Sequence, residues 1–185
     1  MFQRVRVPVL EGEKVILRNW THKDAGDLYE YAKDPRVGPA AGWPPHRSRS
    51  ESGFIIEEVY LRKMDWAITD AKTGRPIGNI GLDDEAIRVK INSREVGYSI
   101  AADCWGRGMA TEALGLVVQY SFEVLGLESL TLRVEPDNMA SRRVAEKCGF
   151  IFEGILRKSY KRYDNVITDM ACYSILDVDY YERDM

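Results

Sequence analysis

Apolar residues recur along the chain with two different periods, one typical of strands and one typical of helices. Alternating or continuous apolar segments predict strands at 15–17, 66–69, 77–82, 95–100, 130–134, 150–158 and 166–176. Helical spacing predicts helices at 21–32, 50–63, 110–125 and 138–147. The resulting order, β-α-α-β-β-β-α-β-α-β-β, indicates an α/β fold with a mixed sheet.

Several of these predicted elements begin or end at residues that are typical of helix caps and turns. Thr21 and Asp24 resemble a capping box at the start of the first helix. Between 35 and 46, prolines and glycines break the chain into a loop that holds Trp43 and His46. The most regular helix ends at Gly126. Its apolar face combines Ala110, Leu114, Val117, Val118, Ser121, Phe122 and Leu125.

Composition narrows the class of protein. The 185 residues are 45% hydrophobic and 30% charged, which predicts one globular domain over 1–185, with a core at about 10–176. The net charge of −3 disfavours a nucleic-acid partner. Cys104, Cys148 and Cys172 form no C-x-x-C pair, and with two histidines no metal site is expected. No apolar run reaches membrane-spanning length, so we expect no membrane partner and a reducing, cytoplasmic location.

The most informative segment is W-G-R-G-M-A-T-E-A at 105–113. It follows a predicted strand and opens a helix, and a glycine-rich turn at a helix N-terminus favours anion binding through backbone N–H groups. No Walker G-x-x-x-x-G-K-[ST] occurs, and Met109-Ala110-Thr111 does not complete a dinucleotide fingerprint. A phosphate-bearing ligand held by main-chain amides is therefore expected, and ATP or NAD is disfavoured.

Two further motifs stand apart from this one. They are G-E-K-V-I-L-R at 12–18 and N-M-A-S at 138–141 followed by E-K-C-G-F at 146–150. Together the three resemble the GCN5-related N-acetyltransferase (GNAT) superfamily, and most closely its ribosomal-protein N-terminal acetyltransferase branch of RimJ/RimL type. The resemblance runs from about Leu10 to about Leu176 and is loosest between Asp34 and Asp65. It implies a mostly antiparallel, twisted sheet of about six to seven strands flanked by about four helices.

The resemblance also implies acetyl-CoA as cosubstrate and no metal. The coenzyme would contact the turn that begins with Trp105 and Gly106, and its pyrophosphate would lie on the amides of Arg107, Gly108, Met109, Ala110 and Thr111. The Thr111 hydroxyl and the Arg107 side chain would add further contacts. The pantetheine arm would pair with the backbone of Tyr98, Ser99 and Ile100, where one N–H would polarise the thioester carbonyl.

For catalysis, the resemblance implies direct attack by an amine in a ternary complex. Asn138, which could equally be a plain helix N-cap, would contact the coenzyme, and Ser141 would hydrogen-bond the departing thiolate. Much of the superfamily uses a Tyr one turn later, but Ala145 occupies that position here. Ser141 or a bound water must then serve as the acid, or protonation comes from elsewhere.

Glu95 is the candidate general base, and its alternative is a structural pair with Arg94 or Arg88. RimL-type enzymes carry a Glu at the place that Tyr160 occupies here, so this chain departs from that exact enzyme. An α-amine, with a pKa of ~7.7–8.0, needs less help from a base than lysine at ~10.4, which favours an α-amine acceptor.

Trp43, His46 and Tyr160 are the candidate acceptor-binding residues. The function expected is transfer of acetyl to a primary amine, most readily a protein N-terminal α-amine. A small amine or an antibiotic as acceptor, and a non-catalytic CoA-binding sensor, stay as alternatives. A homodimer is possible.

Overall fold

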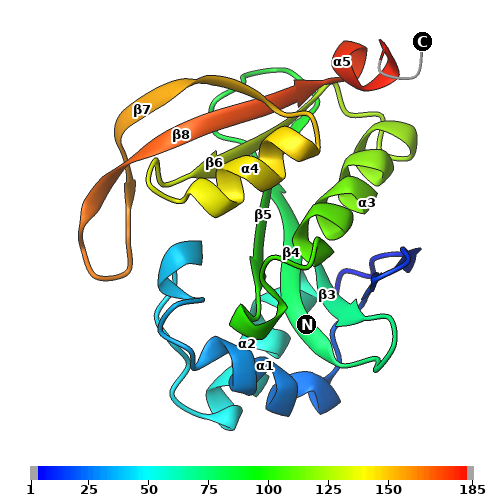
Figure 1. Ribbon diagram of the computed structural model, residues 1–185, viewed down its shortest axis with the longest axis vertical. Coiled ribbons are helices and arrows are strands. Elements are labelled where there is room, and N and C mark those ends of the chain that lie inside the picture. The colour runs from blue at the N-terminus through cyan, green and yellow to red at the C-terminus, as the bar shows by residue number, and fades with distance from the viewer. Residues whose placement is uncertain (1–3, 183–185) are drawn as a thin grey trace.

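An eight-stranded sheet in the order β1-β2-β3-β4-β5-β6-β8-β7 forms the centre of the structure, a computed structural model that describes residues 4–182 (Figure 1). The strands are β1 Leu10–Glu11, β2 Val15–Arg18, β3 Met64–Asp70, β4 Pro76–Asp84, β5 Ser93–Ile100, β6 Ser129–Val134, β7 Ile151–Lys161 and β8 Ile167–Leu176. The expected mixed and mostly antiparallel sheet is confirmed, with a strand count slightly above six to seven. The expected single domain spans 1–185, of which 1–3 and 183–185 lie outside the described residues.

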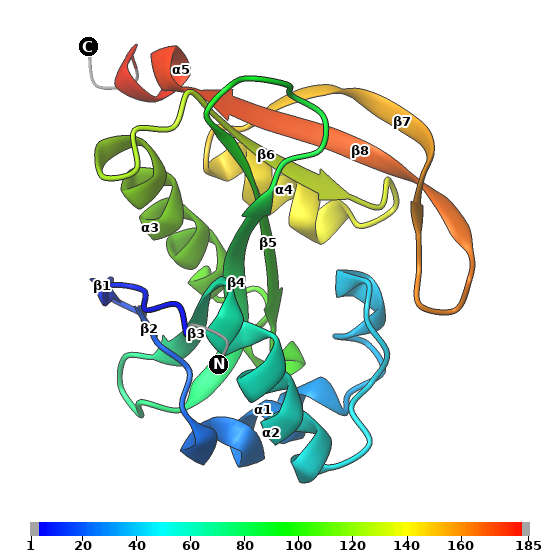
Figure 2. The same ribbon diagram turned by 180° about the vertical axis from the view of Figure 1, so that it is seen from behind.

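Helices flank the sheet on both sides (Figures 1 and 2). They are α1 Ala25–Ala32, α2 Arg49–Glu58, α3 Met109–Glu123, α4 Met139–Lys147 and α5 Asp177–Glu182. On one face, Trp66 of β3 packs edge-on against Tyr120 of α3, with ring centroids 5.7 Å apart. On the other face, Trp20 donates to Asn79 of β4 at 2.8 Å and stacks on Tyr60, which follows α2.

The alternation of side chains explains this layering. Tyr98 of β5 reaches Ser141 of α4, so Val96 and Ile100, which share its face of the strand, lie on that side, and Glu95, Gly97 and Ser99 lie on the opposite side. In α3 the buried residues repeat at helical spacing. They are Met109, Ala113, Leu114, Val117, Val118, Ser121 and Phe122, which largely confirms the predicted apolar face.

β5 and β6 form the one parallel pair among the described strands, and they pair only briefly. Three registered positions join them, from Ser93 with Ser129 to Glu95 with Thr131. Beyond Glu95, β5 continues to Ile100 beside β4, while β6 continues to Val134 beside β8. The two strands therefore diverge and open the sheet, as Figures 1 and 2 show.

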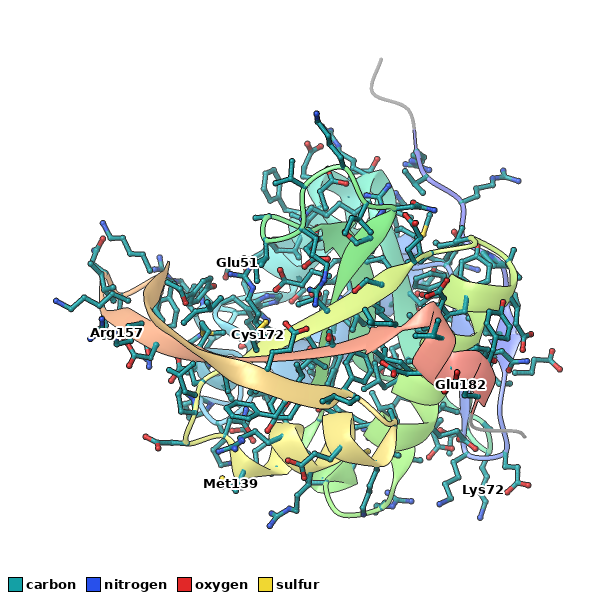
Figure 3. The ribbon with its side chains drawn as sticks, turned by 90° about the horizontal axis from the view of Figure 1, so that it is seen from above. Glu51, Lys72, Met139, Arg157, Cys172 and Glu182 are labelled. Atoms are coloured by element: carbon teal, nitrogen blue, oxygen red, sulfur yellow. The ribbon has the colours of Figure 1, made fainter. Side chains whose placement is uncertain are left out.

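The β7–β8 hairpin is longer than its neighbour β6 and projects beyond it. Figure 3 shows this projection, with Arg157 labelled on it. The sequence predicts strands at 150–158 and 166–176, and β7 continues further, to Lys161. Its far end returns toward the loop after α1, where the hydroxyl of Tyr160 lies 3.5 Å from the carbonyl oxygen of Gly42.

One helix boundary and two short elements differ from the sequence predictions. The helix expected over 50–63 ends at Glu58, because Val59 adopts φ −119°, and a 3₁₀ turn at Tyr60–Arg62 leads into β3. The sequence also missed β1 and α5, which have two and six residues and are too short to show a clear hydrophobic period.

Candidate active site

A cavity of about 440 Å³ lies between the end of β5, the start of α3 and helix α4. Its lining from β5, the following turn and α3 is Tyr98, Ser99, Ile100, Cys104, Trp105, Gly106, Gly108, Met109, Ala110 and Thr111. Helix α4 and its cap add Asn138, Ala140, Ser141, Arg143, Val144 and Lys147, and the loop after α1 adds Val37, Ala40 and Ala41. Every residue that the sequence suggests for the coenzyme lines this cavity except Arg107.

The turn before α3 has the backbone shape that its glycines allow. Gly106 and Gly108 have φ of +72° and +78°, in the region that side chains with a Cβ rarely adopt. Trp105 Nε1 donates to the carbonyl oxygen of Ile100 at 2.9 Å, which ties the turn to the end of β5. Because the first N–H groups of a helix have no acceptor within it, those at the start of α3 can bind an anion at the cavity wall.

Positive charge reaches the cavity from α4. Arg143 and Lys147, one helical turn apart, line it opposite the glycine turn. Arg107 instead is exposed and lies near Asp70, whose pKa is lowered by the backbone N–H of Lys72 and further by this guanidinium. The sequence reasoning missed the two α4 cations, although their i, i+4 spacing on the helix after Asn138 offered a signal.

Asn138 and Ser141 meet at the start of α4. The side chain of Asn138 caps this helix by accepting the backbone N–H of Ser141 at 3.1 Å. The hydroxyl of Ser141 lies 2.9 Å from that of Tyr98, across the opening between β5 and α4. Burial raises the pKa of Tyr98 to about 12. Ala145, at the position where the resemblance implies a Tyr, is fully buried and lies outside the cavity lining.

A second cavity, of about 250 Å³, adjoins the first. It is lined by Ala40, Ala41, Gly42, Asp83, Glu95, Val96, Gly97, Tyr98, Leu132, Arg133, Val134, Glu135, Ser141, Tyr160 and Met170. Both cavities share Ala40, Ala41, Tyr98 and Ser141, so the Tyr98–Ser141 pair stands at their junction. Three carboxylates and one guanidinium give the second cavity an acidic lining, and just outside that lining Lys63 pairs with Asp83 and Arg162 with Glu135.

Glu95 lies in this second cavity but is held by an ion pair that the sequence did not predict. Arg133 Nε and Nη2 donate to both carboxylate oxygens of Glu95, over 2.7–3.0 Å. Arg94 pairs with Asp84 instead, and Arg88 pairs with Glu85 and Glu153. The pairing of Glu95 with Arg94 or Arg88 was therefore wrong, because register places Arg133 of β6 on the same face as Glu95.

Of the three suggested acceptor residues, Tyr160 lines the second cavity, and Trp43 and His46 line neither of the two. Trp43 and His46 pack against each other, with ring centroids 5.1 Å apart, behind the short 3₁₀ turn at Pro39–Ala41. His46 Nδ1 lies 2.9 Å from the hydroxyl of Ser52, and burial lowers the pKa of His46. The residues of this loop that reach both cavities are Ala40 and Ala41, and nothing in their chemistry signals a site.

Within residues 4–182, no group of three or more His, Cys, Asp or Glu side chains is placed to hold a metal ion. Over the same range, no helix has the length and apolar character needed to cross a membrane. The side chains of Cys104, Cys148 and Cys172 are all buried. The first cavity combines main-chain N–H donors, two cations and apolar walls. These groups suit a ligand that carries phosphates and a thioester arm.

Comparison with known proteins agrees with these features. A family model for the acetyltransferase (GNAT) domain matches residues 14–151. The chain is 33% identical over 174 residues to YoaA of Bacillus subtilis, an N-acetyltransferase that is itself uncharacterized, and the match covers 91% of this chain and 97% of YoaA.

Solved structures share the fold. An acetyltransferase of the GNAT family from Bacillus anthracis superposes with a TM-score of 0.81 at 21% identity, covering 92% of this chain and 99% of that one. The ribosomal-protein-S5-alanine acetyltransferase from Vibrio fischeri superposes with a TM-score of 0.74 at 21% identity, covering 94% and 99%.

Proposed function

Because this chain belongs to the GNAT family of acetyl-CoA-dependent N-acetyltransferases, we propose that it transfers the acetyl group to the α-amine of a protein N-terminus. One observation carries the proposal. A cavity with phosphate-binding features and a second cavity with an acidic lining share the Tyr98–Ser141 pair. Transfer in a ternary complex needs two adjoining sites of this kind, one for each substrate.

In the coenzyme cavity, the N–H groups at the start of α3 would hold the pyrophosphate, with Arg143 and Lys147 adding charge from α4. Beyond Glu95, the edge of β5 that faces β6 has no registered partner. The amides of pantetheine can pair with this free edge as a short extra strand. A backbone N–H of the same edge would then donate a hydrogen bond to the thioester oxygen as negative charge develops on it.

The reaction forms a C–N bond and breaks a C–S bond. The neutral amine attacks the thioester carbonyl, and the carbonyl oxygen becomes an oxyanion. When that intermediate collapses, the electron pair of the C–S bond leaves on sulfur, and the hydroxyl of Ser141 donates a hydrogen bond to the thiolate. The nitrogen loses its extra proton to Glu95, reached through a water because Arg133 already occupies one face of that carboxylate.

The acceptor cavity favours a group that arrives as a cation. Asp83, Glu95 and Glu135 line it and pair with Lys63, Arg133 and Arg162 respectively, and of these three cations Arg133 alone is among the lining residues. An α-ammonium, with a pKa of ~7.7–8.0, is attracted by these carboxylates and still loses its proton near neutral pH. A structural neighbour is named as a ribosomal-protein-S5-alanine acetyltransferase, which adds support for this acceptor class.

A small amine as acceptor is the second candidate, favoured by the limited volume of about 250 Å³. The two can be separated by assaying free-thiol release from acetyl-CoA with three acceptors. These are a peptide with a free N-terminus, the same peptide blocked at its N-terminus but containing lysine, and a panel of small amines. Turnover with the free peptide alone supports the proposal, and turnover with small amines alone overturns it.

Coenzyme binding is tested first by thermal unfolding with acetyl-CoA, using ATP and NADH as controls. A ligand at ~100 times its Kd adds ~2.7 kcal/mol to the free energy of unfolding. Stabilisation by acetyl-CoA alone supports the assigned cavity. If acetyl-CoA stabilises the protein but no acceptor gives turnover, the chain is a coenzyme-binding sensor instead.

A further inference from the structure

Tyr98 takes part in the site through its side chain as well as through its backbone. Its hydroxyl oxygen lies 2.9 Å from that of Ser141, and both residues line both cavities. The sequence assigns Tyr98 only a main-chain contact. The ring comes from β5 and the serine comes from the first turn of α4, so the contact spans the opening where the two substrates must meet.

The number of available protons limits how this pair can be arranged. Each hydroxyl has one proton to donate, and each oxygen can accept. The backbone of Ser141 is fixed because its N–H is held by the side chain of Asn138 at 3.1 Å. Burial raises the pKa of Tyr98 to about 12, so its phenol keeps its proton throughout the neutral range.

A thiolate beside Ser141 selects one of the two arrangements. If Ser141 donates to Tyr98, it has no proton left for sulfur. If Tyr98 donates to Ser141, the serine proton is free to point at the thiolate, and the two hydrogen bonds polarise each other in the same direction. Negative charge on sulfur favours the second arrangement.

We propose that Tyr98 is a positioning residue that donates its hydroxyl proton to Ser141 and thereby directs the serine proton to the coenzyme sulfur. This inference rests on the function proposed above. No proton leaves Tyr98 in the reaction: the sulfur departs as a thiolate, stabilised by the hydrogen bond from Ser141, and the proton lost by the amine goes to the base. The pair would supply from β5 and α4 the hydrogen bonding that relatives obtain from a Tyr at the position of Ala145.

The first test compares Tyr98→Phe, Ser141→Ala and the double variant. Tyr98→Phe keeps the ring and removes one oxygen, so we expect kcat to fall by about tenfold with acetyl-CoA affinity changed less than about twofold, as for loss of an interaction made in the transition state. If Tyr98 acts through Ser141, the double variant has the same kcat as Ser141→Ala. Tyr120→Phe is the matched control, because Tyr120 packs on Trp66 away from both cavities, and its kcat should be that of the unaltered protein.

The second test needs no acceptor. Coenzyme A bound to each variant is titrated by the ultraviolet absorbance of its thiolate. A hydrogen bond to the thiolate lowers the pKa of the thiol. The pKa of the bound thiol should therefore be higher by about half a unit or more in Tyr98→Phe than in the unaltered protein. The double variant and Ser141→Ala should have the same thiol pKa. A change in fold stability alone would not produce this pattern.

The outcomes separate this inference from the function it rests on. If coenzyme A does not bind the unaltered protein, the proposed function fails. If it binds, and the kcat and thiol pKa of Tyr98→Phe equal those of the unaltered protein, Tyr98 has no positioning role. Multiplicative effects of the two substitutions on kcat also overturn the inference, because they would mean that Tyr98 acts independently of Ser141.

Discussion

The carboxylate of Glu112, in the first turn of α3, occupies the space that a side chain on Gly12 would need. A Cβ on Gly12 would lie 2.8 Å from Cδ of Glu112. That carboxylate accepts the backbone N–H groups of Glu13, Lys14 and Val15 at 2.8–2.9 Å. The glycine of the first strand motif and the glutamate of the phosphate-turn motif, 100 residues apart in the sequence, are thus one structural unit that anchors the start of α3.

Replacing Glu112 should therefore weaken the fold. Glu112→Gln presents an NH₂ group to backbone donors, and hydrogen bonds to charged groups contribute ~1.5–3 kcal/mol each. We expect the free energy of unfolding in urea to fall by about 2 kcal/mol. Glu13→Gln is the matched control, since that side chain is exposed on the same turn, and its effect should stay within about 0.5 kcal/mol. Equal stability of the two variants would contradict the anchor.

A double-variant cycle tests the contact itself. Gly12→Ala should destabilise the unaltered protein, because the new methyl group displaces the carboxylate of Glu112. In the background of Glu112→Ala the same change should cost less, because the obstructing group is gone. Equal costs in the two backgrounds would mean that Gly12 is needed for another reason.

Gly108, just before α3, and Gly115, inside it, should respond differently to replacement by alanine. Gly108 has φ +78°, and its Cβ would meet Nζ of Lys14 at 3.1 Å, so Gly108→Ala strains the phosphate turn. We expect acetyl-CoA affinity, measured by calorimetry, to fall by about tenfold or more, since a left-handed conformation costs ~1–2 kcal/mol. Gly115, inside α3 with open space around its Cβ, is the control. Gly115→Ala should leave affinity unchanged and raise stability by about 0.5–1 kcal/mol. Unchanged affinity in Gly108→Ala would remove the turn from the binding site.

Glu95→Gln tests the proposed base. If Glu95 accepts the proton of the amine, the acidic limb of the pH profile of kcat/KM should flatten, and kcat should fall by about tenfold or more. The loss should be larger for a lysine side-chain amine than for an α-amine, because their pKa values differ by ~2–3. Since this variant alters the ion pair with Arg133, thermal unfolding and acetyl-CoA binding must show that it is folded. A folded variant with an unaltered profile would assign Glu95 to structure alone.

Asp65 should make stability depend on pH in an unusual direction. Burial raises its pKa to about 7, although a hydrogen bond from Asn79 at 2.8 Å partly offsets this. Below about pH 4 both the folded and the unfolded chain hold the proton, and there is no penalty. As pH rises toward 7 the unfolded chain ionises first, so the free energy of unfolding falls, and above 7 the loss is complete.

Asp65→Asn removes this penalty and can keep the bond from Asn79. We expect the variant to match the unaltered protein near pH 4 and to be more stable at pH 8, by at most about 4 kcal/mol. Asp70→Asn is the opposite control, because the backbone N–H groups of Lys72 and Thr73 lower the pKa of Asp70. Relative to the unaltered protein, that variant should become less stable as pH rises. A stability difference for Asp65→Asn that does not change with pH would contradict the buried ionisation.

The parts of the site that depend on local backbone shape could be predicted from the sequence. The turn at Gly106 and Gly108 and the cap at Asn138 are encoded within a few residues each, and the structure has both. Pairings between distant strands could not be predicted, because they depend on register. Arg133 reaches Glu95, and Tyr98 reaches Ser141, only because β5 pairs with β6 over three positions and then separates. Ala40 and Ala41 carry no chemical signal and reach the cavities by position alone.

The separation of β5 from β6 also affects how such a protein can change. A cosubstrate that hydrogen-bonds to the unpaired edge of a strand is recognised by main-chain groups, and most amino acids supply these groups equally. Substitutions in the lining of the second cavity, at Asp83, Glu135 or Tyr160 of the projecting β7–β8 hairpin, can then alter the choice of amine without weakening binding of the acetyl donor. Donor recognition and acceptor choice are in this way separable in the sequence, and a chain of this design can acquire new acceptors one side chain at a time.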